Sequence, residues 1–168
     1  MKVYSTPLTD STYTLGVDPG SRKTGLALFK GEDLVWWTIA KIPTKLRGIN
    51  AAVTMAATVR AIILERVEPE ARVIIEAPGK QVRSHSGATL ITLGAAVGAI
   101  TYALTDPWTP VTVTVREWSP MGGPRPKKKE DRAVIVASMY PSYDPTTDRA
   151  MDAADAIGLV ASAYNLVT

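Results

Sequence analysis

The chain has 168 residues and a mass of 18.0 kDa, the size of one domain, and 46% of its residues are hydrophobic, enough for a core of its own. It contains no cysteine and a single histidine, His85. This composition excludes a disulfide scaffold, a thiol nucleophile, a cysteine-ligated zinc or iron–sulfur site, and a metal site built from several histidines. Any catalytic chemistry must therefore come from carboxylates, hydroxyls, lysines or arginines.

The net charge is only +3, but the charges are unevenly distributed. Residues 22–47 hold six Lys or Arg against two acids, and residues 116–132 hold six against three. Residues 142–168, by contrast, hold four aspartates and one arginine. Basic loops together with a local carboxylate cluster favour a polyanionic partner with a metal ion between the two. The alternative is an ordinary scatter of surface charge.

Two segments bear on location. Residues 1–13 are polar and mixed in character, unlike a signal peptide, so we expect a cytoplasmic protein with a loose leader at 1–11. Residues 87–105 carry no charge, but they include four threonines and several glycines. This composition favours a helix buried on two sides over a membrane span.

The first part of the chain predicts three short strands, at residues 13–18, 24–29 and 34–40. Turn sequences separate them, which predicts an antiparallel meander. The remaining elements are predicted as a helix at 46–66, a strand at 72–77, a helix at 87–105, a strand at 111–115, and helices at 130–140 and 149–164. The order βββαβαβαα predicts an α/β fold in one domain, residues 1–168, with a mixed five-stranded sheet covered by helices.

Four acidic residues stand at positions that suit a binding site. Asp18 ends the first strand, and Glu76 ends an apolar, β-branched strand. The carboxyl ends of parallel strands are where ligands collect. Asp152 and Asp155 are three residues apart in the last predicted helix, which places both carboxylates on one helix face. Asp148 precedes them and is expected to cap that helix.

Four clustered carboxylates would repel one another unless a cation lay between them. All-oxygen ligation points to Mg²⁺ or Mn²⁺, and two such ions are the usual arrangement for hydrolysing a phosphodiester. The alternative is that each acid is structural: Asp18 as a turn residue, and Asp152 and Asp155 as first-turn helix acids.

Basic residues follow the strand-end acids closely. Arg22 and Lys23 come soon after Asp18, and Lys80 and Arg83 come soon after Glu76. Positive charge beside catalytic acids suits the positioning of phosphate groups, although solvated turns would have the same composition.

Several of these motifs together resemble the RuvC-type Holliday junction resolvases. The motifs are LGVDPG at 15–20, TGLA at 24–27, IIE at 74–76 and DAADA at 152–156, and the segment 88–100 is similar to the central helix of that family. The resemblance covers about residues 13–165. It implies an RNase H-like fold and a homodimer that uses Mg²⁺ or Mn²⁺ to nick two opposing strands of a four-way DNA junction.

The resemblance assigns metal binding and catalysis to Asp18, Glu76, Asp152 and Asp155. It also places a basic residue near the scissile phosphate, for which Lys127, Lys128 and Lys129 are the candidates. The leader and the sparse loops suggest a bacteriophage-encoded branch, which would act in the host cytoplasm.

One position departs from the family pattern. Bacterial members carry an aromatic residue three positions after the strand-end glutamate, where it stacks at the centre of the junction, and this chain has Gly79 there. Without that wedge we expect looser sequence preference and cleavage of other branched DNAs.

Three other functions fit parts of the pattern. The segment 18–25 looks like the phosphate hairpin of ATPases and sugar kinases, but those proteins need two such domains, which 168 residues cannot supply. A monomeric RNA-processing nuclease of the same fold is a second alternative. A non-catalytic DNA-binding module is the third, and it would require the acids to be structural.

Overall fold

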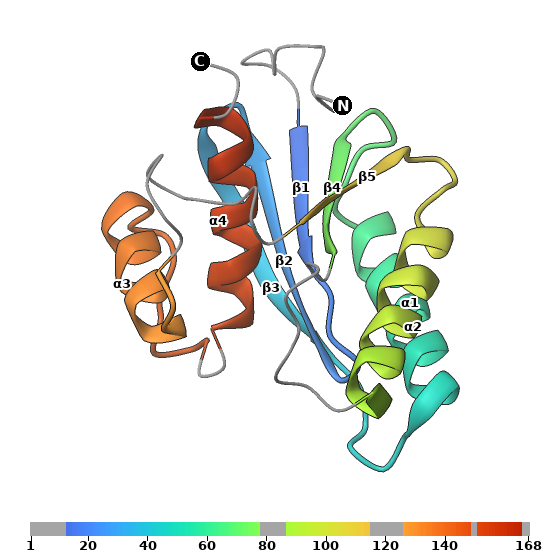
Figure 1. Ribbon diagram of the computed structural model, residues 1–168. Coiled ribbons are helices and arrows are strands. Elements are labelled where there is room, and N and C mark those ends of the chain that lie inside the picture. The colour runs from blue at the N-terminus through green and yellow to red at the C-terminus, as the bar shows by residue number, and fades with distance from the viewer. Residues whose placement is uncertain (1–12, 78–86, 115–125, 149–150, 166–168) are drawn as a thin grey trace.

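The computed structural model describes residues 13–77, 87–114, 126–148 and 151–165 (Figure 1). The predicted leader at 1–11 lies outside these ranges, as do Gly79, Lys80 and Arg83. In the described ranges the predicted element order, βββαβαβαα, is confirmed. None of the helices described is long and apolar enough to cross a membrane.

A single mixed sheet forms the centre of the structure. Its strands are β1 (Tyr13–Asp18), β2 (Lys23–Lys30), β3 (Asp33–Lys41), β4 (Arg72–Ala77) and β5 (Pro110–Thr114), arranged in the order β3-β2-β1-β4-β5. The first three strands pair antiparallel, as the tight turns predict, while β4 runs parallel to both β1 and β5. The parallel strands are reached by crossover helices.

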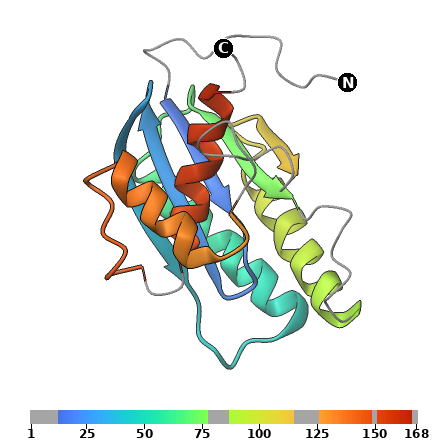
Figure 2. The same cartoon turned by 60° about the vertical axis from the view of Figure 1, so that its left-hand side comes forward.

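Helices cover both faces of this sheet. They are α1 (Gly48–Leu64), α2 (Gly87–Ala103), α3 (Lys129–Met139) and α4 (Asp152–Asn165). Figure 1 shows α1 and α2 on one side of the sheet and α4 on the other, with α3 outside α4, and Figure 2 shows the same layers from another side.

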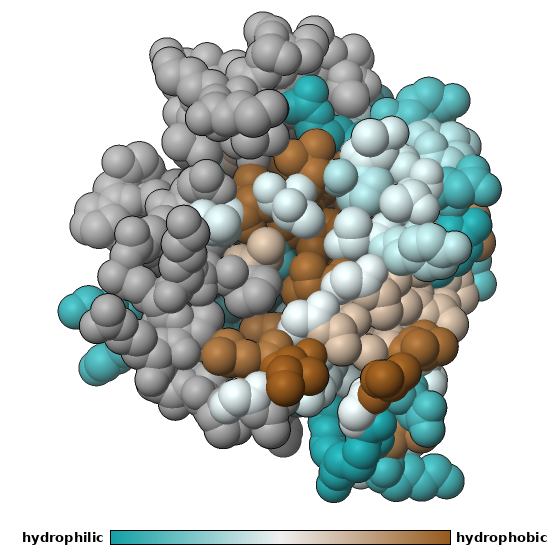
Figure 3. Space-filling model, turned by 45° about the vertical axis from the view of Figure 1, so that its right-hand side comes forward, coloured by the Kyte–Doolittle hydropathy of each residue, from teal (hydrophilic) through white to brown (hydrophobic). Residues whose placement is uncertain are grey.

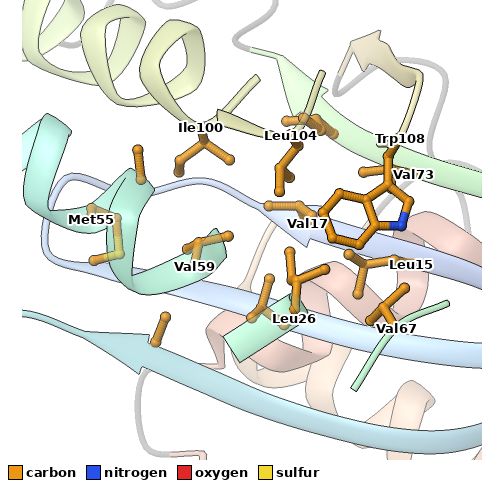
Figure 4. Packing of buried hydrophobic residues seen from close by; sticks show 14 of the residues in the cluster. Leu15, Val17, Leu26, Met55, Val59, Val67, Val73, Ile100, Leu104 and Trp108 are labelled. Carbon is orange, nitrogen blue, oxygen red and sulfur yellow. The ribbon is translucent and has the colours of Figure 1, made fainter. Parts of the chain in front are cut away.

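The larger hydrophobic core lies between the sheet and the pair α1–α2. Strand residues such as Leu15, Val17 and Leu26 pack there against Met55 and Val59 of α1 and residues of α2. Figure 4 shows Trp108 in the same cluster, and its indole N–H donates to the carbonyl oxygen of Glu68 at 2.8 Å. This core holds the sheet rigid behind the face on which the acids lie.

The last helix begins later than the sequence predicts. It starts at Asp152 and not at residue 149, because Met151 adopts a positive φ of 56° that no α-helix contains. The correction matters because it places Asp152 in the first turn of α4.

Candidate active site

Both strand-end acids lie on the α4 face of the sheet. Side chains alternate between the faces of a strand, so Val17 and Ile75 point into the α1–α2 core while Asp18 and Glu76 point to the other side. Val17 and Ile75 are also paired in the parallel register of β1 and β4. Asp18 and Glu76 therefore occupy equivalent ends of neighbouring strands.

Two glycines allow α4 to lie directly on this face. A Cβ atom on Gly16 would overlap the carbonyl oxygen of Ala156, and a Cβ atom on Gly25 would overlap the carbonyl group of Asp152. Gly25 is the partner of Asp18 in the antiparallel register of β1 and β2. The close approach at Gly25 thus brings the first turn of α4 beside Asp18.

A buried aspartate fixes the start of α4. The Asp148 carboxylate accepts hydrogen bonds from the backbone N–H groups of Asp152, Ala153 and Ala154 at 3.1, 2.9 and 3.1 Å. The Tyr143 hydroxyl donates to the same carboxylate at 3.0 Å, and burial together with the charge of Asp148 raises the pKa of that hydroxyl. Asp148 caps the helix through its side chain, as predicted, but it is not the N-cap residue itself, because Met151 is the residue that precedes α4. The capping bonds hold the helix that carries Asp152 and Asp155.

The four acids form one electrostatic cluster around Asp18. Burial is the largest cause that raises the pKa of Asp18 well above its ordinary value, followed by the charges of Glu76 and Asp155 and, more weakly, that of Asp152. Glu76 and Asp155 are themselves only 8% and 2% exposed. So much negative charge in a buried space is relieved either by cations or by a proton on one of the acids.

Helix α3 supplies two of those cations. The Lys129 ammonium donates to Asp152 Oδ1 at 3.0 Å and lies 3.4 Å from Asp155 Oδ2. The Arg132 guanidinium forms a bidentate pair with Asp155, from Nε to Oδ1 at 2.6 Å and from Nη2 to Oδ2 at 3.0 Å. Of the three consecutive lysines at 127–129, Lys129 is the one that contacts Asp152 and Asp155.

Arg132 is a member of the cluster that the sequence motifs do not predict. Its guanidinium is buried and also donates from Nη1 to the carbonyl oxygens of Pro126 and Lys127, at 3.0 and 3.3 Å. The available signal was the helical spacing, because Arg132 shares the buried face of α3 with Ala133 and Val136. An arginine on an apolar helix face indicates a buried acidic partner.

Four other predicted basic residues lie in or beside the turns that follow β1 and precede α3. Arg22 is half-buried in the turn after β1, and Lys23 is exposed at the start of β2. Lys127 and Lys128 are exposed just before α3.

The donor set fits a hard divalent cation. Asp18, Glu76, Asp152 and Asp155 offer only carboxylate oxygens, and burial together with the charges of the other three acids raises the pKa of Asp18, as expected where a cation would be stabilising. Among the described residues, no three acidic side chains converge closely enough to hold an ion as their side chains stand. The Lys129 ammonium contacts both Asp152 and Asp155 in this arrangement, so an ion that used these two carboxylates would have to displace it.

No protein-family model matches the sequence, and no curated protein matches it. Among solved structures, the chain is similar to Thermus thermophilus RuvC in complex with a Holliday junction substrate, with a TM-score of 0.69 and 17% identity over 93% of this chain and 95% of that chain. A second Thermus thermophilus RuvC structure gives a TM-score of 0.65 and 19% identity over 92% and 95% of the two chains. The similarity shows that the fold is the RNase H-like fold of RuvC.

Proposed function

We propose that this protein is a divalent-metal-dependent endodeoxyribonuclease that resolves four-way DNA junctions by paired nicks, and that it also cuts other branched DNAs. The observation that carries the proposal is the buried carboxylate cluster at the carboxyl ends of β1 and β4, under the first turn of α4. The cluster occurs on a fold shared with a RuvC that was solved on a Holliday junction.

The proposed metal ligands are Asp18, Glu76, Asp152 and Asp155. When bound, two Mg²⁺ or Mn²⁺ ions would lower the pKa of an attacking water and stabilise the negative charge that develops on the phosphate. The protein itself holds the four proposed ligands in position. The sheet fixes Asp18 and Glu76, and the Asp148 cap and the Arg132 pair fix the helix acids.

The basic residues around the cluster would hold the DNA backbone. Arg22 and Lys23 follow Asp18 in the chain, and Lys127 and Lys128 are exposed before α3, so both sets are available to phosphates. Lys80 and Arg83 are proposed for the same task from their sequence position alone. The proposal places the protein in a bacterial cytoplasm, and a bacteriophage origin stays a prediction.

Paired nicking of a symmetric junction requires two active sites, and we propose that α2 forms the dimer contact. Ile91, Gly94, Gly98 and Tyr102 follow one another at helical spacing, and all four are exposed. A Cβ atom on either glycine would meet nothing within 4 Å, so a second backbone could approach there. Figure 3 shows apolar residues gathered on this side of the molecule.

The deciding experiment is a nicking assay on a synthetic four-way junction with each strand labelled in turn. With Mg²⁺ or Mn²⁺ we expect symmetric nicks in two opposing strands, and none in EDTA. Asp18→Asn, Glu76→Gln and Asp155→Asn should abolish cleavage but leave junction binding in place, because affinity comes from phosphate contacts. Asp144→Asn is the matched control, since Asp144 is an exposed loop acid whose carboxylate bonds only with Thr146 among the contacts described.

The same assay tests the alternatives through its substrates. A fork, a linear duplex and an RNA–DNA hybrid are run beside the junction. Cleavage of the hybrid alone would support an RNA-processing nuclease, and binding without cleavage under every metal condition would support a non-catalytic module. Either result would overturn the proposed function.

A further inference from the structure

The two cations that contact the acids, Lys129 and Arg132, differ in how firmly the protein holds them. The Lys129 ammonium bridges Asp152 and Asp155, yet 43% of its side chain is exposed. Its long aliphatic side chain can swing into solvent at small cost.

Arg132 cannot leave in this way. Its side chain is only 8% exposed, and its guanidinium is shared between Asp155 and the backbone carbonyls of Pro126 and Lys127. Withdrawing it would leave the Asp155 carboxylate, itself 3% exposed, without its bidentate partner. Each carboxylate oxygen has a second lone pair, so Asp155 can keep Arg132 and still face another cation.

We propose that Lys129 is an internal counter-ion, which occupies the cation position between Asp152 and Asp155 in the metal-free protein and withdraws when a divalent ion binds. This inference rests on the proposed active site and adds a residue that competes with the metal. It is supported by the two contacts of the ammonium, at 3.0 Å from Asp152 Oδ1 and 3.4 Å from Asp155 Oδ2.

Competition between Lys129 and the divalent ion should weaken the measured binding of the metal. The divalent ion must break the contacts of Lys129 with two carboxylates before it can use their oxygens, so the apparent affinity for the metal is lowered. A contact of this partly exposed kind corresponds to about a 1.5- to fivefold change in dissociation constant.

The first test uses the unaltered protein and amine-reactive labelling read by mass spectrometry. We expect Lys129 to be protected in EDTA and to react several-fold faster after Mn²⁺ is added. Lys128, its exposed neighbour in the chain, should react equally in both conditions. Unchanged reactivity of Lys129 in a protein that binds Mn²⁺ would overturn the inference.

The second test is calorimetric titration of Mn²⁺ into the wild type, Lys129→Met and Lys128→Met, without DNA. We expect Lys129→Met to bind Mn²⁺ about 1.5- to fivefold more tightly than the wild type, and Lys128→Met to match the wild type. Equal tightening in both variants would show a general charge effect and overturn the inference while leaving the proposed function intact. No Mn²⁺ binding by any of the three proteins would instead refute the proposed metal site and this inference together.

Discussion

Asp18 is a residue whose charge opposes folding when no metal is bound. Its raised pKa means that the folded protein holds the Asp18 proton more tightly than the unfolded chain does. The contribution of Asp18 to the stability of the metal-free protein is therefore greatest at acidic pH, and it falls as the pH rises from the ordinary range of an aspartate to the raised pKa.

Asp18→Asn removes the ionisable carboxyl group, and with it the loss of stability that the Asp18 charge causes as the pH rises. In EDTA we expect the variant to melt at a higher temperature than the wild type at neutral pH, and its melting temperature to change less with pH. Thermal denaturation across a pH series measures both effects. A variant that is less stable than the wild type at neutral pH in EDTA would contradict the prediction that the Asp18 charge destabilises the metal-free protein.

Arg132 is expected to matter for stability more than any exposed cation. Arg132→Met leaves the buried Asp155 carboxylate without its bidentate partner, and removing one member of such a pair costs about 3–5 kcal/mol in free energy of unfolding. Urea denaturation gives the value.

The double variant Arg132→Met, Asp155→Asn separates the pair from the packing of the arginine. Because neither charge remains, the double variant should be more stable than Arg132→Met alone. Strictly additive losses would mean that the two side chains do not act together.

Among the helices and strands, the position of α4 on β1 and β2 matters most for the site. Gly25→Ala would push the first turn of α4, which carries Asp152, away from Asp18. We expect a loss of about 1–3 kcal/mol in free energy of unfolding, together with slower cleavage.

The control for this substitution is Gly87→Ala at the first residue of α2, outside the proposed dimer stripe, where an added Cβ meets no atom within 4 Å. Alanine favours a helix over glycine, so this variant should lose no stability. Equal losses in the two variants would show that the close approach at Gly25 is not required.

For the molecule as a whole, the proposed dimer depends on the exposed stripe of α2. Gly98→Arg places a long charged side chain where a second backbone would approach, and we expect this variant to sediment as a monomer at micromolar concentration while the wild type sediments as a dimer. Val134→Arg on α3, at a residue 68% exposed, is the matched control and should stay dimeric. A monomeric wild type would rule out this interface.

Binding of DNA should draw on the exposed lysines before α3. Replacing Lys127 and Lys128 by alanine should weaken junction binding and reduce the slope of log affinity against log salt by about two units, because two fewer phosphates would be neutralised by the protein. Fluorescence anisotropy over a salt series gives the slope. An unchanged slope would show that these lysines are only solvated.

The strand ends and the acids that stand there could be predicted from the amino-acid sequence. Alternation in β1 and β4 places Asp18 and Glu76 on one face, and helical spacing places Asp152 beside Asp155. These features were predictable because strand and helix periods are local properties of the chain.

The cations that meet those acids could be identified only from the folded chain. Lys129 reaches Asp152, and Arg132 reaches Asp155, across 23 residues of sequence in each case. The three consecutive lysines are equivalent in the sequence, and no motif marks Arg132 as a partner. Such pairings arise from the packing of α3 against α4, which depends on contacts between distant segments. Helical spacing marks Arg132 as buried, but nothing in the sequence of either helix identifies its partner.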